Sequence, residues 1–482
     1  MPPETTDLET SRLAEVQAPT TGSRLVIVAN RLPVRWSDEG SDAGRWVPSP
    51  GGLVSAVGPA IAQQPGEAAW IGWTGSHTED EPFEIDGLHL HPVPITQDEK
   101  ELFYDGMSNG TLWPLYHDKV VPAEFHRHWF DGYRRINQRY AEEAAATAGE
   151  GATVWVHDYQ LQIVPGMLRE LRPDVRIGFF LHIPFPPPEL FVALPWRNQL
   201  AEGMLGADLV GFQTPDSAAN FHRLTVRLGL ADRVDNERVR VGGRTVRACA
   251  YPIGIDVARY EEAAREDATT DAARDLRARL GAPHTMLLGV DRLDYTKGID
   301  VRLRALRELL DDGLVNPSQV TMVQIAQPSR DDVEAYITLR EEVERLVGQI
   351  NGDHARVGFP VVHYIHQDVE FEELLAMYRA ADVMLVTPFR DGMNLVAKEY
   401  VATRYDLTGT LVLSEFAGAA TELSDALLVN PFDIDGLKSA IVRAVSMPPD
   451  EARERMSKLR AAVEANDANG WARGFLDDLA TG

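Results

Sequence analysis

Short apolar runs that alternate with helix-forming stretches are the feature that most constrains the fold of this chain. Several of the runs, such as 24–30 and 285–291, are continuously apolar rather than alternating. Continuous apolar runs predict strands covered on both faces, as in parallel sheets, and strand–helix alternation predicts right-handed crossovers between them. The runs lie at 24–30, 68–75, 153–158, 176–182, 208–214, 285–291, 321–327, 361–366, 382–388, 409–416 and 426–431.

The number of predicted strands is too large for one open sheet of ordinary size. With 482 residues the chain is long enough for two domains that each have a full hydrophobic core. We therefore predict an α/β protein of two doubly wound domains, with a TIM barrel as the alternative. The break is expected near residues 250–260, where "AYPIGIDVARY" places proline and glycine before a charge-rich helix.

The C-terminal segment carries a second structural signal. Trp471, Phe475 and Leu479 lie at positions i, i+4 and i+8 and form one apolar stripe of a helix. Such a stripe must be buried against another surface, and we expect the helix to return to the N-terminal domain. The expected organisation is a mobile tail at 1–23, an N-terminal domain at 24–252, a C-terminal domain at 253–460 and the returning helix at 461–482.

The charge balance excludes two classes of partner. The chain has 47 basic and 73 acidic side chains, a formal net charge of −26, which repels nucleic acids and anionic membranes. Its single cysteine, Cys249, cannot form an internal disulfide, as is usual in a reducing compartment. The first 23 residues do not have the apolar core of a secretory signal, and no apolar run approaches the ~20 residues that span a bilayer. We expect a cytoplasmic protein.

Polar side chains gather where the predicted strands end, and in open parallel sheets ligands bind beyond those ends. Taken singly, each of these side chains is compatible with an ordinary surface charge or helix cap. Cations and helix N-termini that meet at one crevice, however, predict phosphorylated ligands, here two of them. The side chains are Arg31, Asp158, His182, Arg292, Lys297 and Arg330, and Gly51-Gly52 opens a predicted helix after the first strand.

The segment "TPFRDGMNLVAKEY" (387–400) has the parts of an anion site, namely a strand, a turn and a helix. The backbone N–H groups from Asp391 to Leu395, at the expected helix N-terminus, can bind the diphosphate of a nucleotide. Glu399 lies roughly 7 to 8 Å further along such a helix, about the distance from a diphosphate to its ribose. Its carboxylate can accept from both ribose hydroxyls, and Asp391 would face the sugar that the diphosphate carries.

Fixed cations are expected to take the place of a metal ion in this site. The only Asp-x-Asp sequence, Asp433 and Asp435 in "PFDIDG", is better interpreted as a helix N-cap pair. We predict no essential metal and no cofactor. No G-x-G-x-x-G follows the strand at 24–30, which argues against a nicotinamide-dependent dehydrogenase.

A set of long motifs runs in order from Arg24 to the C-terminal helix, and together these motifs resemble trehalose-6-phosphate synthase. They are "ANR", "GGL", "IGWTG", "LWPLYH", "VWVHDYQL", "GFFLHIPFP", "GFQT", "YPIGID", "VDRLDYTKGI", "QIAQPSR", "DGMNLVAKEY" and "EFAGAATEL". The resemblance implies a retaining glycosyltransferase of the GT-B architecture, in which two Rossmann-like domains face each other across a cleft. It also implies transfer of glucose from a nucleotide-glucose to glucose 6-phosphate, which gives α,α-trehalose 6-phosphate and the nucleoside diphosphate.

The same resemblance implies a role for each site residue. Catalytic roles fall to Arg292, Lys297, His182 and Asp391. Donor-binding residues would be Gly52, Arg292, Lys297, Asp391, Gly392, Met393, Asn394, Leu395 and Glu399, with Arg292 and Lys297 on the phosphates and Glu399 on the ribose. Acceptor-binding residues would be Arg31, Tyr104, Trp113 and Arg330 on the 6-phosphate and Asp158 on sugar hydroxyls, with His182 close to the transferred glucose.

Several alternatives stay open at this point. A sister transferase with another phosphorylated acceptor, such as glycerol 3-phosphate, would use the same donor site. A non-catalytic sugar-phosphate sensor is possible because a fold does not determine function. No motif distinguishes uridine, adenine and guanine in the donor, and retention can proceed by front-face attack or by two displacements. We further expect a homo-oligomer, either a dimer or a tetramer.

Overall fold

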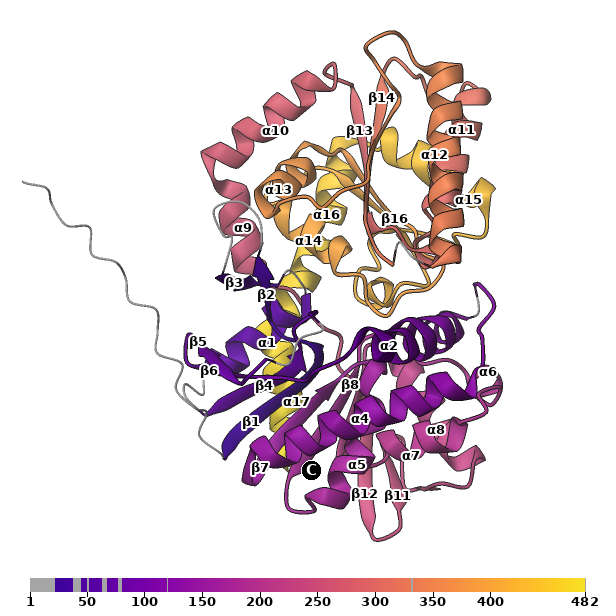
Figure 1. Ribbon diagram of the computed structural model, residues 1–482. Helices are drawn as coiled ribbons and strands as arrows, with labels where there is room; N and C mark the ends of the chain where they lie inside the picture. The colour runs from indigo at the N-terminus through magenta and orange to yellow at the C-terminus, as the bar shows by residue number, and fades with distance from the viewer. Residues whose placement is uncertain are drawn as a thin grey trace, which may run out of the picture.

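The computed structural model describes residues 22–37, 45–49, 52–62, 67–76, 80–118, 120–330 and 333–481. Two α/β lobes lie one above the other, each built on its own sheet (Figure 1). The structure has two open sheets and not a TIM barrel, the alternative that the sequence left open. The tail predicted at 1–23 lies, up to residue 21, outside the described residues.

The first sheet has ten strands in the order β10-β11-β12-β9-β8-β7-β1-β4-β6-β5. Its central strands, from β12 to β6, are parallel, and antiparallel strands extend both edges. The strands are β1 (Ser23–Arg31), β4 (Ala68–Trp73), β5 (Phe83–Ile85), β6 (Leu88–Pro92), β7 (Ala148–His157), β8 (Arg176–Leu181), β9 (Leu209–Phe212), β10 (Asp232–Arg233), β11 (Arg238–Val241) and β12 (Arg244–Ala250). A separate hairpin pairs β2 (Val34–Ser37) with β3 (Arg45–Pro48).

Two parallel strands, β6 and β12, were not predicted. Their sequences, "LHLHP" and "RTVRACA", interrupt the apolar run with histidine or arginine. The structure accommodates these polar side chains by pairing them: His91 contacts Glu143 at 2.8 Å and Arg247 contacts Asp478 at 2.9 Å. Local apolar patterning alone therefore does not identify them.

The second sheet is wholly parallel, with the order β15-β14-β13-β16-β17-β18. This is the doubly wound order 3-2-1-4-5-6, which places a crevice at the point where the winding direction reverses, between β13 and β16. The strands are β13 (Thr285–Arg292), β14 (Val320–Gln327), β15 (Val362–Ile365), β16 (Val383–Val386), β17 (Thr410–Ser414) and β18 (Leu427–Val429).

Helices cover both faces of both sheets, which explains the continuously apolar strands. In the first lobe these are α1 (Gly52–Ala62), α2 (Gln97–Lys100), the π-helix η2 (Glu101–Leu112), α3 (Trp113–Tyr116), α4 (Arg127–Thr147), η3 (Tyr159–Leu161), α5 (Val164–Leu171), α6 (Pro188–Phe191), α7 (Arg197–Met204) and α8 (Pro215–Arg227). In the second lobe they are α9 (Val257–Arg265), α10 (Asp267–Arg279), η4 (Tyr295–Lys297), α11 (Ile299–Asp311), α12 (Glu334–His354), α13 (Phe371–Ala380), α14 (Leu395–Thr403), η5 (Gly418–Thr421), α15 (Ile434–Val445) and α16 (Pro449–Ala465).

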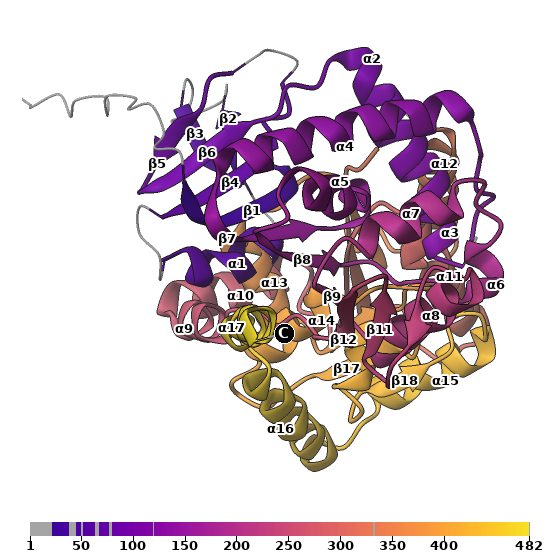
Figure 2. The same ribbon diagram turned by 90° about the horizontal axis from the view of Figure 1, so that it is seen from below.

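The last helix, α17 (Ala468–Thr481), packs against the first sheet, although α16 before it packs in the second lobe (Figures 1 and 2). Phe475 stacks on Trp155 of β7 with ring centroids 4.6 Å apart, and Trp471 and Leu479 are also buried. The apolar stripe predicted for this helix is thus buried where it was expected. The two Rossmann-like domains and the returning helix are confirmed, and the residue boundaries of the domains stay a prediction.

The chain crosses between the lobes twice, and the two crossings run side by side. Gly254 in the first crossing has no room for a side chain, because a Cβ there would lie 2.1 Å from the carbonyl oxygen of Asn466 in the second. The backbone N–H of Ala468 donates to the carbonyl oxygen of Ile255 at 3.0 Å. Within the described ranges, no helix has the length and apolar character required to cross a membrane.

Candidate active site

The first lobe contributes aromatic and cationic side chains at the carboxyl end of its sheet. The guanidinium of Arg31, the last residue of β1, lies 4.1 Å from the ring centroid of Trp73. Tyr104 lies on the π-helix η2, an unusual helix type that often marks functional sites. Burial raises the pKa of the Tyr104 hydroxyl, but the nearby guanidiniums of Arg330, Arg31 and Arg292 more than offset this and lower it. Cations from both lobes therefore converge on one tyrosine.

Trp113, at the start of α3, is the surface on which these cations pack. Its buried ring lies 4.2 Å from the guanidinium carbon of Arg330 and 5.6 Å from that of Arg292. Both arginines come from the second lobe, so the indole contacts side chains from the opposite side of the cleft. Cation–π contacts of this kind hold guanidiniums in place without consuming their hydrogen-bond donors.

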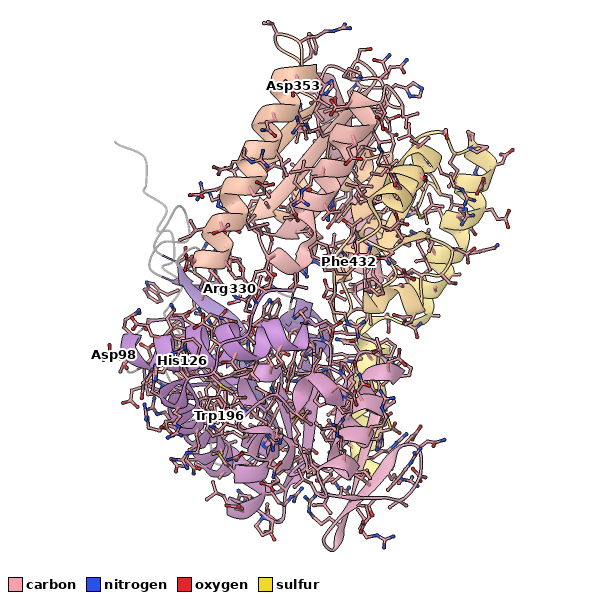
Figure 3. All side chains as sticks on the ribbon, turned by 90° about the vertical axis from the view of Figure 1, so that its right-hand side faces the viewer. Asp98, His126, Trp196, Arg330, Asp353 and Phe432 are labelled. Atoms are coloured by element: carbon pink, nitrogen blue, oxygen red, sulfur yellow. The ribbon has the colours of Figure 1, made fainter. Side chains whose placement is uncertain are left out.

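Arg330 crosses the cleft from the second lobe (Figure 3). It follows β14 with a φ of +54°, an uncommon conformation for a residue other than glycine. Its guanidinium donates at 3.2 Å to Asp294 Oδ2 in its own lobe and at 3.2 Å to the hydroxyl of Tyr159 in the first lobe. The side chain is only 5 % exposed, and it also contacts the hydroxyl of Tyr336. Arg330 is thus held between the lobes by residues of both.

Asp158 and His182 end neighbouring strands of the first sheet, β7 and β8, as predicted. Asp158 has φ +74° and ψ 172°, a region that side-chain-bearing residues rarely occupy. Its Oδ1 accepts from the backbone N–H of His182 at 3.1 Å. Burial raises the pKa of the Asp158 carboxyl to about 6, and burial lowers the pKa of the His182 imidazole to about 3. His182 is therefore neutral at physiological pH.

Lys297 and Asp391 form an ion pair at the mouth of the second lobe. Lys297 Nζ lies 2.5 Å from Asp391 Oδ2, and both side chains are largely buried. Asn394 Nδ2 donates to the same carboxylate oxygen at 3.1 Å. Burial raises the pKa of Asp391, but the ammonium of Lys297 outweighs this and lowers it, so the carboxylate stays charged. The structure brings these residues together as the sequence predicted.

The helix after Asp391 begins later than expected. Helix α14 starts at Leu395, and its N-cap is Asn394, whose φ of +79° is left-handed and whose Oδ1 accepts from the N–H of Ala397 at 3.3 Å. Gly392 and Met393 therefore lie in a loop before the helix, and the prediction that the helix opens at Asp391 is wrong. The hydrogen bond from Asn394 Nδ2 to Asp391 Oδ2 still ties this loop to the N-cap of the helix.

Glu399 lies on α14 and is partly buried. Its Oε2 accepts from the hydroxyl of Tyr378 at 2.9 Å, and burial raises the pKa of its carboxyl. The carboxylate is thus oriented by a tyrosine from α13 rather than free in solvent. Gly52 begins α1 on the first lobe, and Gly51 lies outside the described residues.

The backbones of the two lobes meet where the loop before α14 approaches the end of β8. A Cβ at Gly392 would lie 2.0 Å from the carbonyl oxygen of His182 and 3.0 Å from the Cα of Ile183. Glycine is the only residue that allows this approach of two backbones. The lobes are therefore in contact across the cleft in this structure.

Several residues of the site were not singled out from the sequence. His117, within the "LWPLYH" motif, is buried, and its Nδ1 lies 2.8 Å from the carbonyl oxygen of Trp113. Burial lowers the pKa of His117 to about 4, although the second-lobe carboxylates Asp294 and Asp391 act in the opposite direction. Tyr159, Tyr336 and Tyr378 supply the hydroxyls that orient Arg330 and Glu399. Tyr159 lies in the "VWVHDYQL" motif, whereas Tyr336 and Tyr378 lie outside the motifs given above. For none of the three does the sequence reveal the partner of the hydroxyl.

A cavity of about 370 Å³ opens at the carboxyl end of the first sheet, and Arg31 and Asp158 both line it. Among the described residues, no group of three or more histidine, cysteine or carboxylate side chains is arranged to hold a metal ion. Asp433 is the N-cap of α15, with its Oδ1 accepting from the N–H of Gly436 at 3.0 Å, as predicted for the Asp-x-Asp sequence.

Comparison with known proteins places this geometry in a family. The model of glycosyltransferase family 20 matches residues 23–481. A trehalose-6-phosphate synthase of Mycolicibacterium smegmatis is 54% identical over 467 residues, which is 95% of this chain and 92% of that protein.

Solved structures agree with the sequence match. An α,α-trehalose-phosphate synthase (UDP-forming) of Burkholderia xenovorans, in complex with glucose-6-phosphate, superposes with a TM-score of 0.86 at 36% identity and covers 95% of this chain and 100% of that one. An E. coli structure bound with UDP-2-fluoro glucose superposes with a TM-score of 0.87 at 34% identity, over 95% of this chain and 99% of that one.

Proposed function

The chain belongs to glycosyltransferase family 20, and from that premise we propose that it transfers glucose from UDP-glucose to glucose 6-phosphate. The products would be α,α-trehalose 6-phosphate and UDP. Relatives that are UDP-forming, or bound to glucose-6-phosphate or to a UDP-glucose analogue, support both substrates. The chain would then be a hexosyltransferase of trehalose synthesis.

The acceptor site rests on one observation, the convergence of guanidiniums from both lobes on Tyr104. Arg31 lies in the first lobe, and Arg330 and Arg292 approach from the second, with their guanidinium carbons 4.2 and 5.6 Å from the ring of Trp113. A phosphate dianion is the ligand that such a set of planar, charged donors suits best. We assign the binding of the acceptor 6-phosphate to these three arginines, with Tyr104 and Trp113 lining the site. The carboxylate of Asp158 would accept from a hydroxyl of the same sugar.

The donor site lies against the second lobe. Arg292, Lys297 and the N–H groups from Gly392 to Leu395 would hold the diphosphate, and Gly52 would close over it from the first lobe. Glu399, oriented by Tyr378, would accept from the ribose hydroxyls. Asp391 would accept from hydroxyls of the transferred glucose, with its charge maintained by Lys297.

The reaction requires stabilisation of a leaving diphosphate and of an oxocarbenium-like glucose. Arg292 and Lys297 would face the phosphates, so side-chain cations already in the site would stabilise the charge that develops there. We propose retention by front-face attack. The bond from C1 to the phosphate oxygen breaks, the acceptor hydroxyl oxygen bonds to C1 on the same face, and its proton passes to the departing phosphate. No carboxylate nucleophile or metal ion is required by this scheme.

A product assay tests the proposal. Wild-type enzyme would be incubated with UDP-, ADP- or GDP-glucose and with either glucose 6-phosphate or glycerol 3-phosphate. Proton NMR of the products should show the α,α linkage from glucose 6-phosphate, with UDP-glucose as an efficient donor. A product from glycerol 3-phosphate alone would indicate a sister transferase, and binding without turnover would indicate a sensor. The homo-oligomer and the cytoplasmic location stay predictions.

A further inference from the structure

His157, the last residue of β7, lies directly behind His182 and has no role in the scheme above. The Nδ1 atom of His157 is 3.2 Å from Nε2 of His182, and the side chain of His157 is completely buried. Both imidazole rings have aromatic neighbours. The ring centroid of Trp155 lies 4.6 Å from that of His157, and the ring centroid of Trp471, on the returning helix, lies 6.0 Å from that of His182. The pair is therefore held in one geometry.

Both imidazoles are neutral, because burial lowers the pKa of each one. Two neutral imidazoles at hydrogen-bond distance share one proton, so only two arrangements are possible. In the first, His182 donates from Nε2, and the proton of His157 must then sit on its own Nε2. In the second, His157 donates from Nδ1, and His182 then carries its proton on Nδ1.

The surroundings of His157 distinguish these arrangements. Its Nε2 atom is buried and has no hydrogen-bond partner in the described part of the chain. A buried N–H without an acceptor is rarer and more costly than a lone pair without a donor. The second arrangement is therefore favoured, because it places the unpaired N–H on Nδ1 of His182, which is only partly buried, instead of on the enclosed Nε2 of His157. The proton of His157 is then on Nδ1.

This arrangement determines what His182 offers to a ligand. Its Nδ1 makes no hydrogen bond to any described residue, and its carbonyl lies against Gly392 of the donor loop. We propose that His157 is a positioning residue that fixes the tautomer of His182, so that His182 presents Nδ1–H as a donor to an oxygen of the transferred glucose. The inference rests on the proposed function for the identity of that sugar.

The tautomer can be measured without any substrate. Ligand-free, full-length enzyme labelled with ¹⁵N-histidine would be examined by long-range ¹H–¹⁵N correlation NMR, which distinguishes Nδ1–H from Nε2–H imidazoles. The His182 signals would be assigned by their loss in His182→Gln. We expect His182 to be protonated on Nδ1. A His182 protonated on Nε2, or a charged imidazolium at pH 7, would overturn the inference.

Two variants of His157 separate positioning from packing. In His157→Asn the side-chain amide can donate from nearly the position of Nδ1, whereas His157→Leu removes the donor. We expect His157→Leu to lower kcat roughly 10- to 100-fold, the usual loss when a partner that orients a functional histidine is removed, and to change the His182 tautomer. His157→Asn should restore most of the rate and the Nδ1–H signal. Equal rates in the two variants, with an unchanged His182 tautomer, would contradict the positioning role.

A matched control comes from His222 on α8. It is also a buried histidine: its Nε2 lies 3.0 Å from the carbonyl oxygen of Ala248, and its buried Nδ1 has no partner among the described residues. His222→Leu should leave kcat and the His182 signals unchanged, and a loss equal to that of His157→Leu would count against the inference. If wild-type enzyme formed no disaccharide phosphate, the proposed function would fail, while the tautomer measurement would still decide the present inference.

Discussion

Replacing Asp158 with asparagine is expected to stabilise the folded protein while it weakens acceptor binding. Burial raises the pKa of the Asp158 carboxyl to about 6, against 3.8 for an ordinary aspartate. The folded state therefore binds this proton more tightly than the unfolded chain does. Wild-type stability falls as the pH rises between those two pKa values, and the loss is complete above the higher one.

The magnitude follows from the two pKa values. Their difference corresponds to about 3 kcal/mol of unfolding free energy at neutral pH. Asparagine has nearly the same shape, has no charge to desolvate and can still accept the 3.1 Å hydrogen bond from the N–H of His182. It also tolerates a positive φ better than most residues. We expect the free energy of unfolding of Asp158→Asn to exceed that of wild type by up to about 3 kcal/mol at pH 7.5. At pH 5.5 this difference should be about 1 kcal/mol smaller.

Urea denaturation of wild type and Asp158→Asn at pH 5.5 and 7.5 measures this gain. Steady-state kinetics should show kcat/KM for glucose 6-phosphate lowered roughly 10- to 100-fold, the value of a hydrogen bond to a charged group. Asp174→Asn is the control, because hydrogen bonds from Arg172 hold the pKa of Asp174 well below its usual range. That variant should not be stabilised at either pH. An Asp158→Asn protein that is no more stable than wild type at pH 7.5, or whose advantage shrinks as the pH rises, would refute the reasoning.

Four further predictions test the cleft. Arg330→Ala should weaken glucose 6-phosphate binding roughly 10- to 100-fold, because it removes a charged donor held between the lobes, and should leave UDP binding near normal. Calorimetry of each ligand would check this, and an unchanged affinity for glucose 6-phosphate would contradict a role for Arg330 in binding the acceptor across the cleft. Lys297→Ala or Arg292→Ala should lower kcat roughly 10²- to 10³-fold with little change in glucose 6-phosphate affinity, and a variant that keeps a third of the wild-type rate would remove that cation from the mechanism. Gly392→Ala should hold the lobes apart, since its Cβ would lie 2.0 Å from the carbonyl oxygen of His182; solution scattering with UDP and glucose 6-phosphate should give a larger radius of gyration than wild type, and equal radii would argue against the contact. Exhaustive chelation should leave activity intact because the cations are side chains, and activity that disappears with chelator and returns with magnesium or manganese would show this interpretation of the donor site to be wrong.

Patterns in the sequence predicted the two doubly wound domains and the residues that lie at the strand ends. Every apolar run predicted as a strand contains a strand in the structure. A strand that is buried on both faces requires consecutive apolar residues, and that pattern is visible in the sequence alone. The polar residues that end those strands, among them Asp158, His182 and Arg292, lie in the cleft because parallel strands end at one edge. The apolar stripe of α17 likewise required a partner surface, and the first sheet provides it.

Which of these groups come into contact depends on the tertiary structure. The guanidinium of Arg330 donates to the hydroxyl of Tyr159, in the other lobe, at 3.2 Å. No local pattern predicts a contact between residues so far apart in the sequence. The start of α14 depends on the left-handed conformation of Asn394. The good helix formers around Asn394 give no sign of this conformation in the sequence. The tautomer of His182 depends on its contact with His157 from the neighbouring strand. Patterns along the chain report burial and local backbone preference, whereas hydrogen bonds, pKa values and tautomers depend on neighbours that only folding brings together.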